Sequence, residues 1–179
     1  SYMPHSWEVR CNNLKSPFET FQTDRERVDK KVIQMNHLNT PSGLRKTLRL
    51  MSGSQGVSNF RPTAATAIYN RFLPYGGITW DMSGGYGGRL LGAIKSQISY
   101  IATEPAEKTV IGLREIIEDH GYITNIFRTI PHMEIVQKGS EDFLPDKESL
   151  DLCFTSPPYF DTEKYSDEDT QSYIKFPTQ

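Results

Sequence analysis

The chain has 179 residues, of which 36% are hydrophobic and 23% charged, and its formal net charge is −2 at pH 7. This composition is typical of a globular protein with a sizeable core. No apolar run approaches the roughly 20 residues of a membrane span, and the first ten residues lack the apolar stretch of a signal peptide. We therefore expect a cytoplasmic protein with no membrane partner. Cys11 and Cys153 are too few for a disulfide framework and lack metal-ligand spacing, so we expect no metal site.

Charge is distributed unevenly along the chain. Residues 1–60 contain nine Lys or Arg and five Asp or Glu, a balance of +4. Residues 139–170 contain two and ten, a balance of −8. A nucleic-acid partner would therefore have to bind the first segment, or something outside this chain. Ordinary solvated surface explains both segments equally well.

The N-terminal segment, residues 1–58, is polar and is expected to be mostly irregular. Helical spacing of apolar residues predicts one helix, from about Thr23 to Met35. Asn39–Gly43 predicts a turn, and Gly53–Gly56 predicts a flexible loop. The sequence of residues 1–58 predicts no function for this segment.

From residue 59 to residue 179 the pattern predicts one α/β domain in which helices and strands alternate. The expected helices are Thr63–Phe72, Arg89–Ser96 and Ala106–His120, and the expected strands are Ile78–Met82, Ser99–Thr103, Met133–Gln137 and Leu150–Thr155. Strands that alternate with helices of this length indicate βαβ units and a parallel, Rossmann-like sheet. Right-handed crossovers then predict helices on both faces. Cys153, inside the last strand, is expected in the core.

A glycine-rich turn follows the first of these strands. Trp80–Arg89 has the sequence Trp-Asp-Met-Ser-Gly-Gly-Tyr-Gly-Gly-Arg and leads into a helix. Glycines allow a sharp turn and a close approach of the backbone to a ligand. A plain turn would also explain this segment, because such patterns are weak by themselves.

An acid ends the next strand. Glu104 follows Gly84 by 20 residues, which puts a carboxylate at the tip of the neighbouring strand. In a Rossmann-like sheet, a carboxylate there can accept hydrogen bonds from both ribose hydroxyls of an adenosine ligand. An exposed acid at a strand end is the alternative, and the spacing favours the ligand.

A proline loop ends the last strand. In Thr155–Tyr159 two prolines stop the strand, fix the local φ angles and leave carbonyl groups free to accept hydrogen bonds. Ser156 and the carbonyl of Pro157 could accept from an amine, and Tyr159 could stack on a ring. This combination is suited to holding a flat base that carries an amino group.

Thr155–Tyr159 resembles the catalytic loop of the amino-group DNA methyltransferases, in which Asp, Asn or Ser precedes Pro-Pro-Tyr/Phe/Trp. Asp81–Gly88 is similar to their cofactor glycine loop, although Ser-Gly-Gly-Tyr-Gly replaces the commoner Gly-x-Gly core. Glu104 matches their ribose-binding acid. Asn59–Thr63 resembles the segment near the methionine end of the cofactor, and Gly139–Phe143 lies where the family contacts the cofactor's adenine.

The resemblance covers roughly Asn59 to Tyr165 and implies S-adenosylmethionine as the cofactor and DNA as the partner, with a flipped or single-stranded base. The implied catalytic residues are Ser156, Pro157, Pro158 and Tyr159. The implied cofactor-binding residues are Phe60, Pro62, Asp81, Ser83, Gly84, Gly85, Gly87, Glu104, Asp142 and Thr155. Neither cysteine follows a proline, as the nucleophile of ring-carbon methylation typically does.

The family's sheet has seven strands, whereas four are expected here. The resemblance therefore implies that the C-terminal strands are missing from this sequence, or that a further segment or subunit completes the sheet. The target base, the recognition sequence and an accompanying restriction enzyme stay open. So do three alternatives: a methyltransferase for guanine amines in RNA, one for glutamine in protein, and an inactive half-domain that binds a partner. A nicotinamide dehydrogenase would share the glycine loop and the acid but would not need Ser-Pro-Pro-Tyr.

Overall fold

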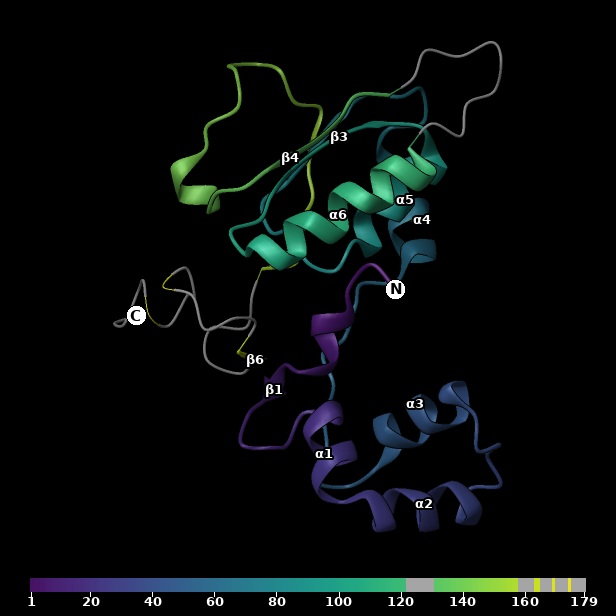
Figure 1. Ribbon diagram of the computed structural model, residues 1–179. Helices are drawn as coiled ribbons and strands as arrows, with labels where there is room; N and C mark the ends of the chain where they lie inside the picture. Colours follow the sequence, from purple (N-terminus) through teal and green to yellow (C-terminus); the bar gives the residue numbers. More distant parts are fainter. Residues whose placement is uncertain (122–130, 158–162, 165–168, 170–173, 175–179) are drawn as a thin grey trace. The chain divides into compact units, whose positions relative to one another are not determined.

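The computed structural model describes residues 1–121, 131–157, 163–164, 169 and 174 (Figure 1). The chain divides into two compact units. The sheet unit consists of Ser1–Met3 and Asn59–Pro158, and the helical unit consists of Pro4–Ser58 and Tyr159–Gln179.

The sheet unit is built on four parallel strands. These are β2 (Ile78–Asp81), β3 (Ser99–Thr103), β4 (Met133–Val136) and β5 (Leu152–Cys153), in the order β4-β3-β2-β5. The helices are α4 (Pro62–Phe72), α5 (Gly88–Ser96) and α6 (Glu107–His120). This arrangement confirms the predicted α/β fold with a parallel, Rossmann-like sheet, and β3 has the predicted bounds.

All three helices of the sheet unit lie on one face of the sheet (Figure 1). The steps from β2 to β3 and from β3 to β4 go in the same direction, so two right-handed crossovers place α5 and α6 on the same side. The return from β4 to β5 contains only the short η2 (Ser140–Asp142). The prediction of helices on both faces was therefore wrong for the described residues.

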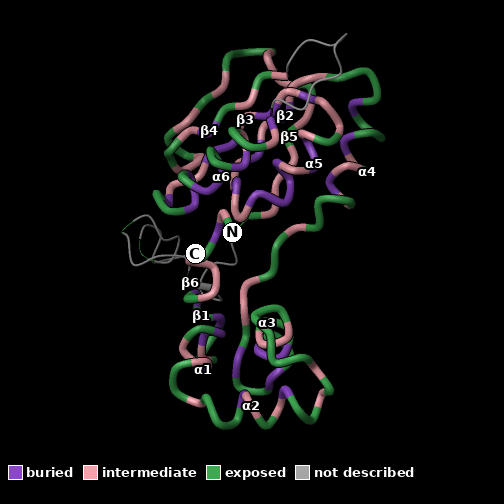
Figure 2. Tube along the Cα trace, turned by 45° about the vertical axis from the view of Figure 1, so that its right-hand side comes forward, coloured by how far each residue is buried: buried purple, intermediate pink, exposed green. Residues whose placement is uncertain are grey.

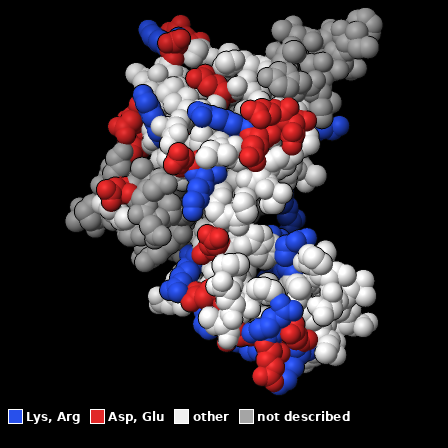
Figure 3. Space-filling view, in the orientation of Figure 1, with Lys and Arg blue, Asp and Glu red and all other residues white. Residues whose placement is uncertain are grey.

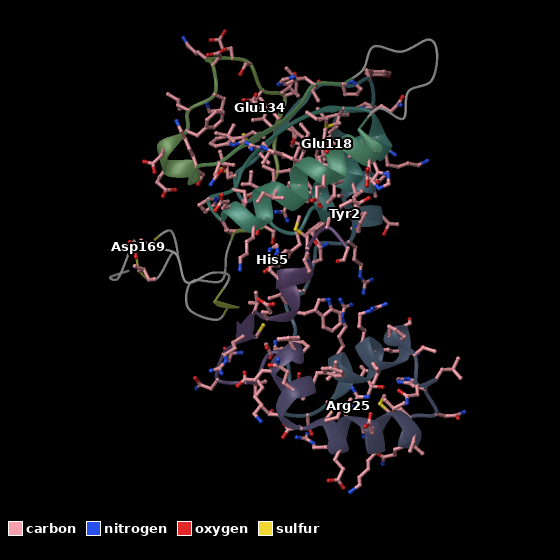
Figure 4. The ribbon with its side chains drawn as sticks, in the orientation of Figure 1. Tyr2, His5, Arg25, Glu118, Glu134 and Asp169 are labelled. Carbon is pink, nitrogen blue, oxygen red and sulfur yellow. The ribbon has the colours of Figure 1, made fainter. Side chains whose placement is uncertain are left out.

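The core lies between the sheet and these helices. Its central members are fully buried, among them Tyr69, Leu90, Tyr100 and Leu113. Tyr100 and Ala102 of β3 point toward the helices, because alternate residues of a strand share a face. The N-terminal residues also belong here. Tyr2 lies beside α6 (Figure 4). Its hydroxyl donates to Asp119, near the end of that helix, over 2.7 Å.

Strand β5 is shorter than predicted, although its hydrogen bonds with β2 extend beyond it. Asp151 N donates to Ile78 O (2.9 Å), and Phe154 N donates to Trp80 O (3.0 Å). Cys153 is exposed, so the prediction that it is a core residue was wrong. Cys153 pairs with Trp80, whose side chain points to the face opposite the helices, and no described helix covers that face at the edge strand.

The helical unit was the least predictable part of the chain. It contains η1 (Pro4–Trp7), α1 (Pro17–Thr23), α2 (Arg25–Gln34) and α3 (Pro41–Leu50), and β1 (Arg10–Cys11) pairs antiparallel with β6 (Glu163–Lys164). Figure 2 shows buried positions on the inner sides of α2 and α3 and exposed positions outside. A small core joins them, consisting of Val28, Val32, Leu48 and Met51. The expectation of a mostly irregular segment was therefore wrong.

The residues that predicted a turn instead begin α3. Thr40 is the N-cap, and its hydroxyl accepts a hydrogen bond from Gly43 N over 3.2 Å. Pro41 occupies the first turn, where its missing N–H costs nothing. Turn residues and helix-start residues are the same types, which explains the error.

The helices in the described part of the chain are too short or too polar to span a membrane.

A close contact between α4 and α5 depends on Gly92. A Cβ at Gly92 would lie 2.5 Å from the Cβ of Ala65 and 3.1 Å from the carbonyl oxygen of Pro62. Glycine inside a helix normally costs about 1 kcal/mol relative to alanine. The close helix packing explains why glycine stands here.

Gly92→Ala should therefore lower the free energy of unfolding, because overpacking costs about 1–3 kcal/mol and exceeds the gain in helix propensity. Urea denaturation followed by circular dichroism would measure it. Ala65→Gly in the same molecule removes the opposing methyl group, so the double variant should be more stable than the sum of the single changes implies. Additive effects would contradict the contact.

Candidate functional site

Three segments of the sheet unit meet at one edge of the sheet. Parallel strands end at the same edge, which we call the carboxyl edge. Strand β2 lies between β3 and β5, so the loop after β2 is flanked by the residues that follow both neighbours. The glycine loop (Ser83–Gly88) is thus placed between Glu104 on one side and Thr155–Pro157 on the other. Ligands of open α/β sheets bind outside this edge.

A buried ion pair fixes the start of the glycine loop. Asp81 ends β2 with no exposed surface, and Arg89 is 5% exposed. Asp81 Oδ2 accepts from Arg89 Nε and from the hydroxyl of Tyr100, each over 2.6 Å. Asp81 Oδ1 accepts from Ser83 N over 3.2 Å, and Arg89 also donates to the carbonyl oxygen of Ser83. The network joins β2, β3, the loop and α5.

Burial and the charge of Asp81 shift the pKa values of the side chains around it. Burial, and then the charge of Asp81, raise the pKa of Tyr100 well above 10.0, so its hydroxyl remains a neutral donor. The pKa of Tyr69 is raised for the same two reasons. Burial alone would lower the pKa of Arg89, but the charge and the hydrogen bond of Asp81 outweigh it and raise that pKa. Asp81 thus holds the loop, and its predicted contact with a cofactor stays a prediction.

The glycines of the loop are required by geometry. Gly85 and Gly87 have φ values of +54° and +82°, in the left-handed region that glycine adopts without strain. A Cβ at Gly87 would lie 2.7 Å from Ile116 Cδ1, and one at Gly84 would lie 3.1 Å from Leu113 Cδ1. Both neighbours belong to α6. Gly84 and Gly87 therefore allow the loop to lie directly on α6, and the sequence alone did not distinguish this from contact with a ligand.

Glu104 connects the loop to the next strand. Its Oε2 accepts from Gly85 N over 3.0 Å, and its Oε1 accepts from Ala106 N over 3.0 Å. The side chain is half-buried. These two bonds, one to each oxygen, fix the direction of the carboxylate. The structure thus places the predicted acid beside the predicted loop.

Phe60 lies where the glycine loop, α5 and the end of β5 meet. Its ring makes an edge-to-face contact with Phe154 (5.4 Å between centroids), and the guanidinium of Arg89 lies 5.5 Å from its centroid. Asn59 Nδ2 donates to Tyr86 O over 3.1 Å. Pro62 is exposed and begins α4. The predicted Asn59–Thr63 segment therefore does lie beside the loop.

Several buried polar atoms near the carboxyl edge lack partners. Within the described residues, Thr103 Oγ1, Thr155 Oγ1 and Trp80 Nε1 are buried without a hydrogen bond. A buried polar group costs about 1–3 kcal/mol when it stays unpaired, so these atoms mark a part of the edge that an internal water molecule would stabilise. Sequence reasoning had missed Thr103 and Trp80, whose only signal is their position at strand ends.

The remaining predicted residues differ in how far they can be placed. Asp142 is exposed at the end of η2, and the next residue, Phe143, packs against Trp80 at 5.7 Å between centroids. Ser156 is half-buried and Pro157 is exposed. Pro158 and Tyr159 lie outside the described residues. In the described part of the chain, no group of three or more His, Cys, Asp or Glu could hold a metal ion.

Comparisons with known proteins yield weak likenesses. No family model matches the chain, and no curated protein matches it. A Haemophilus influenzae protein described as a "putative methylase" has 16% identity and a TM-score of 0.42 over 58% of this chain and 60% of its own. The N-terminal domain of EvdMO1, solved with SAH and D-fucose, has 17% identity and a TM-score of 0.34 over 64% of this chain and 45% of its own. These values assign no family.

Arg89→Met should destabilise the sheet unit by about 3–5 kcal/mol, because it leaves the buried charge of Asp81 without its partner. Denaturant unfolding would measure the loss. Asp81→Asn in the same molecule should restore part of it, since the uncompensated charge is then absent.

Arg25→Met is the matched control, because it breaks the exposed pair with Asp29 (3.1 Å). Such pairs contribute about 0.3–0.5 kcal/mol. Equal losses for Arg89→Met and Arg25→Met would show that the buried pair does not hold the loop.

Proposed function

We propose that the chain is the cofactor-binding and catalytic part of an S-adenosylmethionine-dependent methyltransferase that methylates the exocyclic amine of adenine or cytosine in DNA. One observation carries the proposal. The glycine loop, Glu104 and the Ser156–Pro157 pair follow three neighbouring parallel strands and so share the carboxyl edge. The proline loop thereby adds amine acceptors to an edge that is already suited to a nucleoside.

The residues at the carboxyl edge fit the cofactor. Glu104 is oriented by two backbone N–H groups, and its carboxylate is proposed to accept hydrogen bonds from the ribose hydroxyls. Asp142, on the surface after β4, is proposed to contact the adenine. S-adenosylmethionine would supply a methyl group activated by its sulfonium.

The proline loop supplies the chemistry of the acceptor. The amine of a base is a weak nucleophile, because its lone pair is delocalised into the ring. Ser156 Oγ and the carbonyl oxygen of Pro157 would accept hydrogen bonds from the amine, favouring a tetrahedral nitrogen with an exposed lone pair. Holding that nitrogen in line with the methyl group supplies proximity, worth several kcal/mol. Pro158 would stiffen the loop, and Tyr159 would stack on the flipped base.

Other activities would use parts of the same edge. A nicotinamide dehydrogenase would use the glycine loop and Glu104 but gives no role to Ser156 and Pro157. Methyltransferases of guanine in RNA, or of glutamine in protein, would use a similar proline loop. DNA is proposed because Ser before the two prolines matches the DNA family's pattern. The remaining alternative is a binding module without activity.

Cofactor binding is the first test. Glu104→Gln should weaken S-adenosylhomocysteine by about 1–3 kcal/mol in isothermal titration calorimetry, the scale of a hydrogen bond to a charged group. Glu107→Gln, an exposed change in the first turn of α6, is the control and should leave the affinity unchanged. Unchanged affinity in Glu104→Gln would remove Glu104 from the site. Binding of NADH but not S-adenosylhomocysteine would overturn the proposal.

Methyl transfer is the second test. With labelled S-adenosylmethionine and duplex DNA, nucleoside masses after digestion should show a methyl group on the adenine or cytosine amine. Ser156→Ala should lower turnover more than cofactor affinity, whereas Ser58→Ala, an exposed change, should leave both unchanged. Tyr159→Ala should weaken base capture by about 1–3 kcal/mol, and Tyr159→Phe should retain most of it. Label on the cytosine ring carbon, on RNA only or on protein only would each contradict the proposal.

A further inference from the structure

Only some of the basic side chains of the helical unit form ion pairs. Residues 4–58 contain nine Lys or Arg and five Asp or Glu. Four of those acids form one ion pair each. The pairs are Arg10–Glu19 (2.6 Å), Lys15–Asp24 (3.0 Å), Arg25–Asp29 (3.1 Å) and Lys30–Glu26 (2.6 Å). In Figure 3, basic and acidic side chains accordingly alternate over α2. These four pairs leave five cations without an acid.

The five remaining cations all lie on α2 and α3. They are Arg27, Lys31, Arg45, Lys46 and Arg49, and within the described residues none of them forms an ion pair with a carboxylate. Arg49 lies 5.0 Å above the ring of Trp7, a contact that orients the guanidinium without neutralising it. Residues 25–50 carry seven basic and two acidic side chains. The unit's positive charge is thus concentrated on two helices.

On α3 these cations form one exposed face. Arg45, Lys46 and Arg49 have the i, i+1, i+4 spacing that places side chains on one side of a helix. All three are exposed, whereas Thr47 and Leu48 are buried on the opposite side. There is no acidic residue on α3. We call Arg45, Lys46 and Arg49 the basic face.

A pocket on α2 is also lined by basic side chains. Its volume is about 250 Å³, and it is lined by Arg27, Lys30, Lys31, Gln34, Met51 and Ser52. Arg27 is held there by hydrogen bonds to Ser52, and Lys31 Nζ donates to Gln34 Oε1 over 3.0 Å. No carboxylate lines this pocket. Its cations and amide fit a phosphate group.

We propose that α2 and α3 bind the phosphate backbone of duplex DNA, through the basic face and the pocket of Arg27 and Lys31. Unpaired cations at helical spacing match a polyanion that carries one charge per about 1.7 Å of duplex. The choice of DNA among polyanions rests on the proposed function. The contacts are to phosphate and therefore position the duplex without reading its sequence.

The balance of basic and apolar side chains favours a polyanion over a membrane surface. A helix that lies on a membrane inserts apolar side chains between its basic ones. Two large apolar side chains of α2 and α3 are exposed, Ile33 (79%) and Leu50 (56%). The seven basic side chains of residues 25–50 outnumber them.

Fluorescence anisotropy of a labelled DNA duplex, titrated with the full chain without cofactor in a salt series, tests the proposal. Each phosphate contact should contribute about 0.9 to the slope of log affinity against log salt, or roughly 5-fold in affinity near 0.15 M. The triple change Arg45→Gln, Lys46→Gln and Arg49→Gln should make the slope shallower by about 2.7 and weaken binding about 100-fold. Arg27→Gln with Lys31→Gln should remove about two further contacts.

The matched control changes three paired cations of the same unit, Arg10→Gln, Lys15→Gln and Arg25→Gln. It lowers the net charge as much as the basic-face variant does. The slope of log affinity against log salt should nevertheless stay near that of the unmodified chain. Circular dichroism of each variant checks the fold. Equal losses in the control and the basic-face variant would overturn the proposal, as would binding without salt dependence.

Two further outcomes test the choice of partner. Vesicles that contain anionic lipid should not displace the duplex, and an RNA duplex of the same sequence should not bind more tightly. The opposite result in either case overturns the choice of DNA. A chain that binds DNA through α2 and α3 but transfers no methyl group contradicts only the proposed function. A chain that methylates DNA while the basic-face variant keeps its full salt slope contradicts only this inference.

Discussion

The ion pair between Asp81 and Arg89 is the interaction on which the carboxyl edge depends. Both charges are removed from water, so each is tolerable only while the other remains in place. The pair joins the last residue of β2 to the first turn of α5, and the same residues bind Ser83 N and O. The glycine loop between them has its two ends fixed, which leaves its backbone N–H groups in a defined direction.

Two carboxylates at this edge therefore have different roles. Asp81 is fully buried, and its oxygens accept from Arg89, Tyr100 and Ser83, so it stabilises the loop. Glu104 is half-buried and accepts from two backbone N–H groups, which orient it at the end of β3. The family resemblance of the sequence implied that both Asp81 and Glu104 bind the cofactor. Their surroundings, which only the fold provides, separate a structural acid from a candidate binding acid.

Much of the sheet unit could be predicted from the sequence, because periodicity and strand-end residues are local signals. The existence and order of β2, β3 and β4, with the helices between them, follow from such signals. The side of the sheet that each helix covers does not, since it depends on the direction of each crossover. No local pattern predicted the ion pair between Arg89 and Asp81. It forms only because the glycine loop brings the first turn of α5 back to the end of β2. Cys153 was misplaced because a strand pattern does not show which strand lies at an edge.

The helical unit was less predictable for a related reason. Thr40, Pro41 and Gly43 are residues of turns and equally of helix starts, and only the hydrogen bond from Gly43 N to Thr40 decides between them. The core of the helical unit is also small, and its buried members are Val28, Val32, Leu48 and Met51. With so few apolar residues, their spacing predicted the helices only weakly. The basic face became visible only when the ion pairs showed which cations were already neutralised.

The uneven charge of the chain agrees with the two ligands that we propose. S-adenosylmethionine carries a positive sulfonium, so acidic groups near the carboxyl edge, such as Glu104, Glu141 and Asp142, favour it. The same acidic charge repels the phosphates of DNA. The flipped base is proposed to reach this edge, so the phosphates of the duplex would be stabilised by basic residues elsewhere in the chain. The concentration of unpaired Lys and Arg on α2 and α3, away in sequence from the acidic 139–170 segment, meets that requirement.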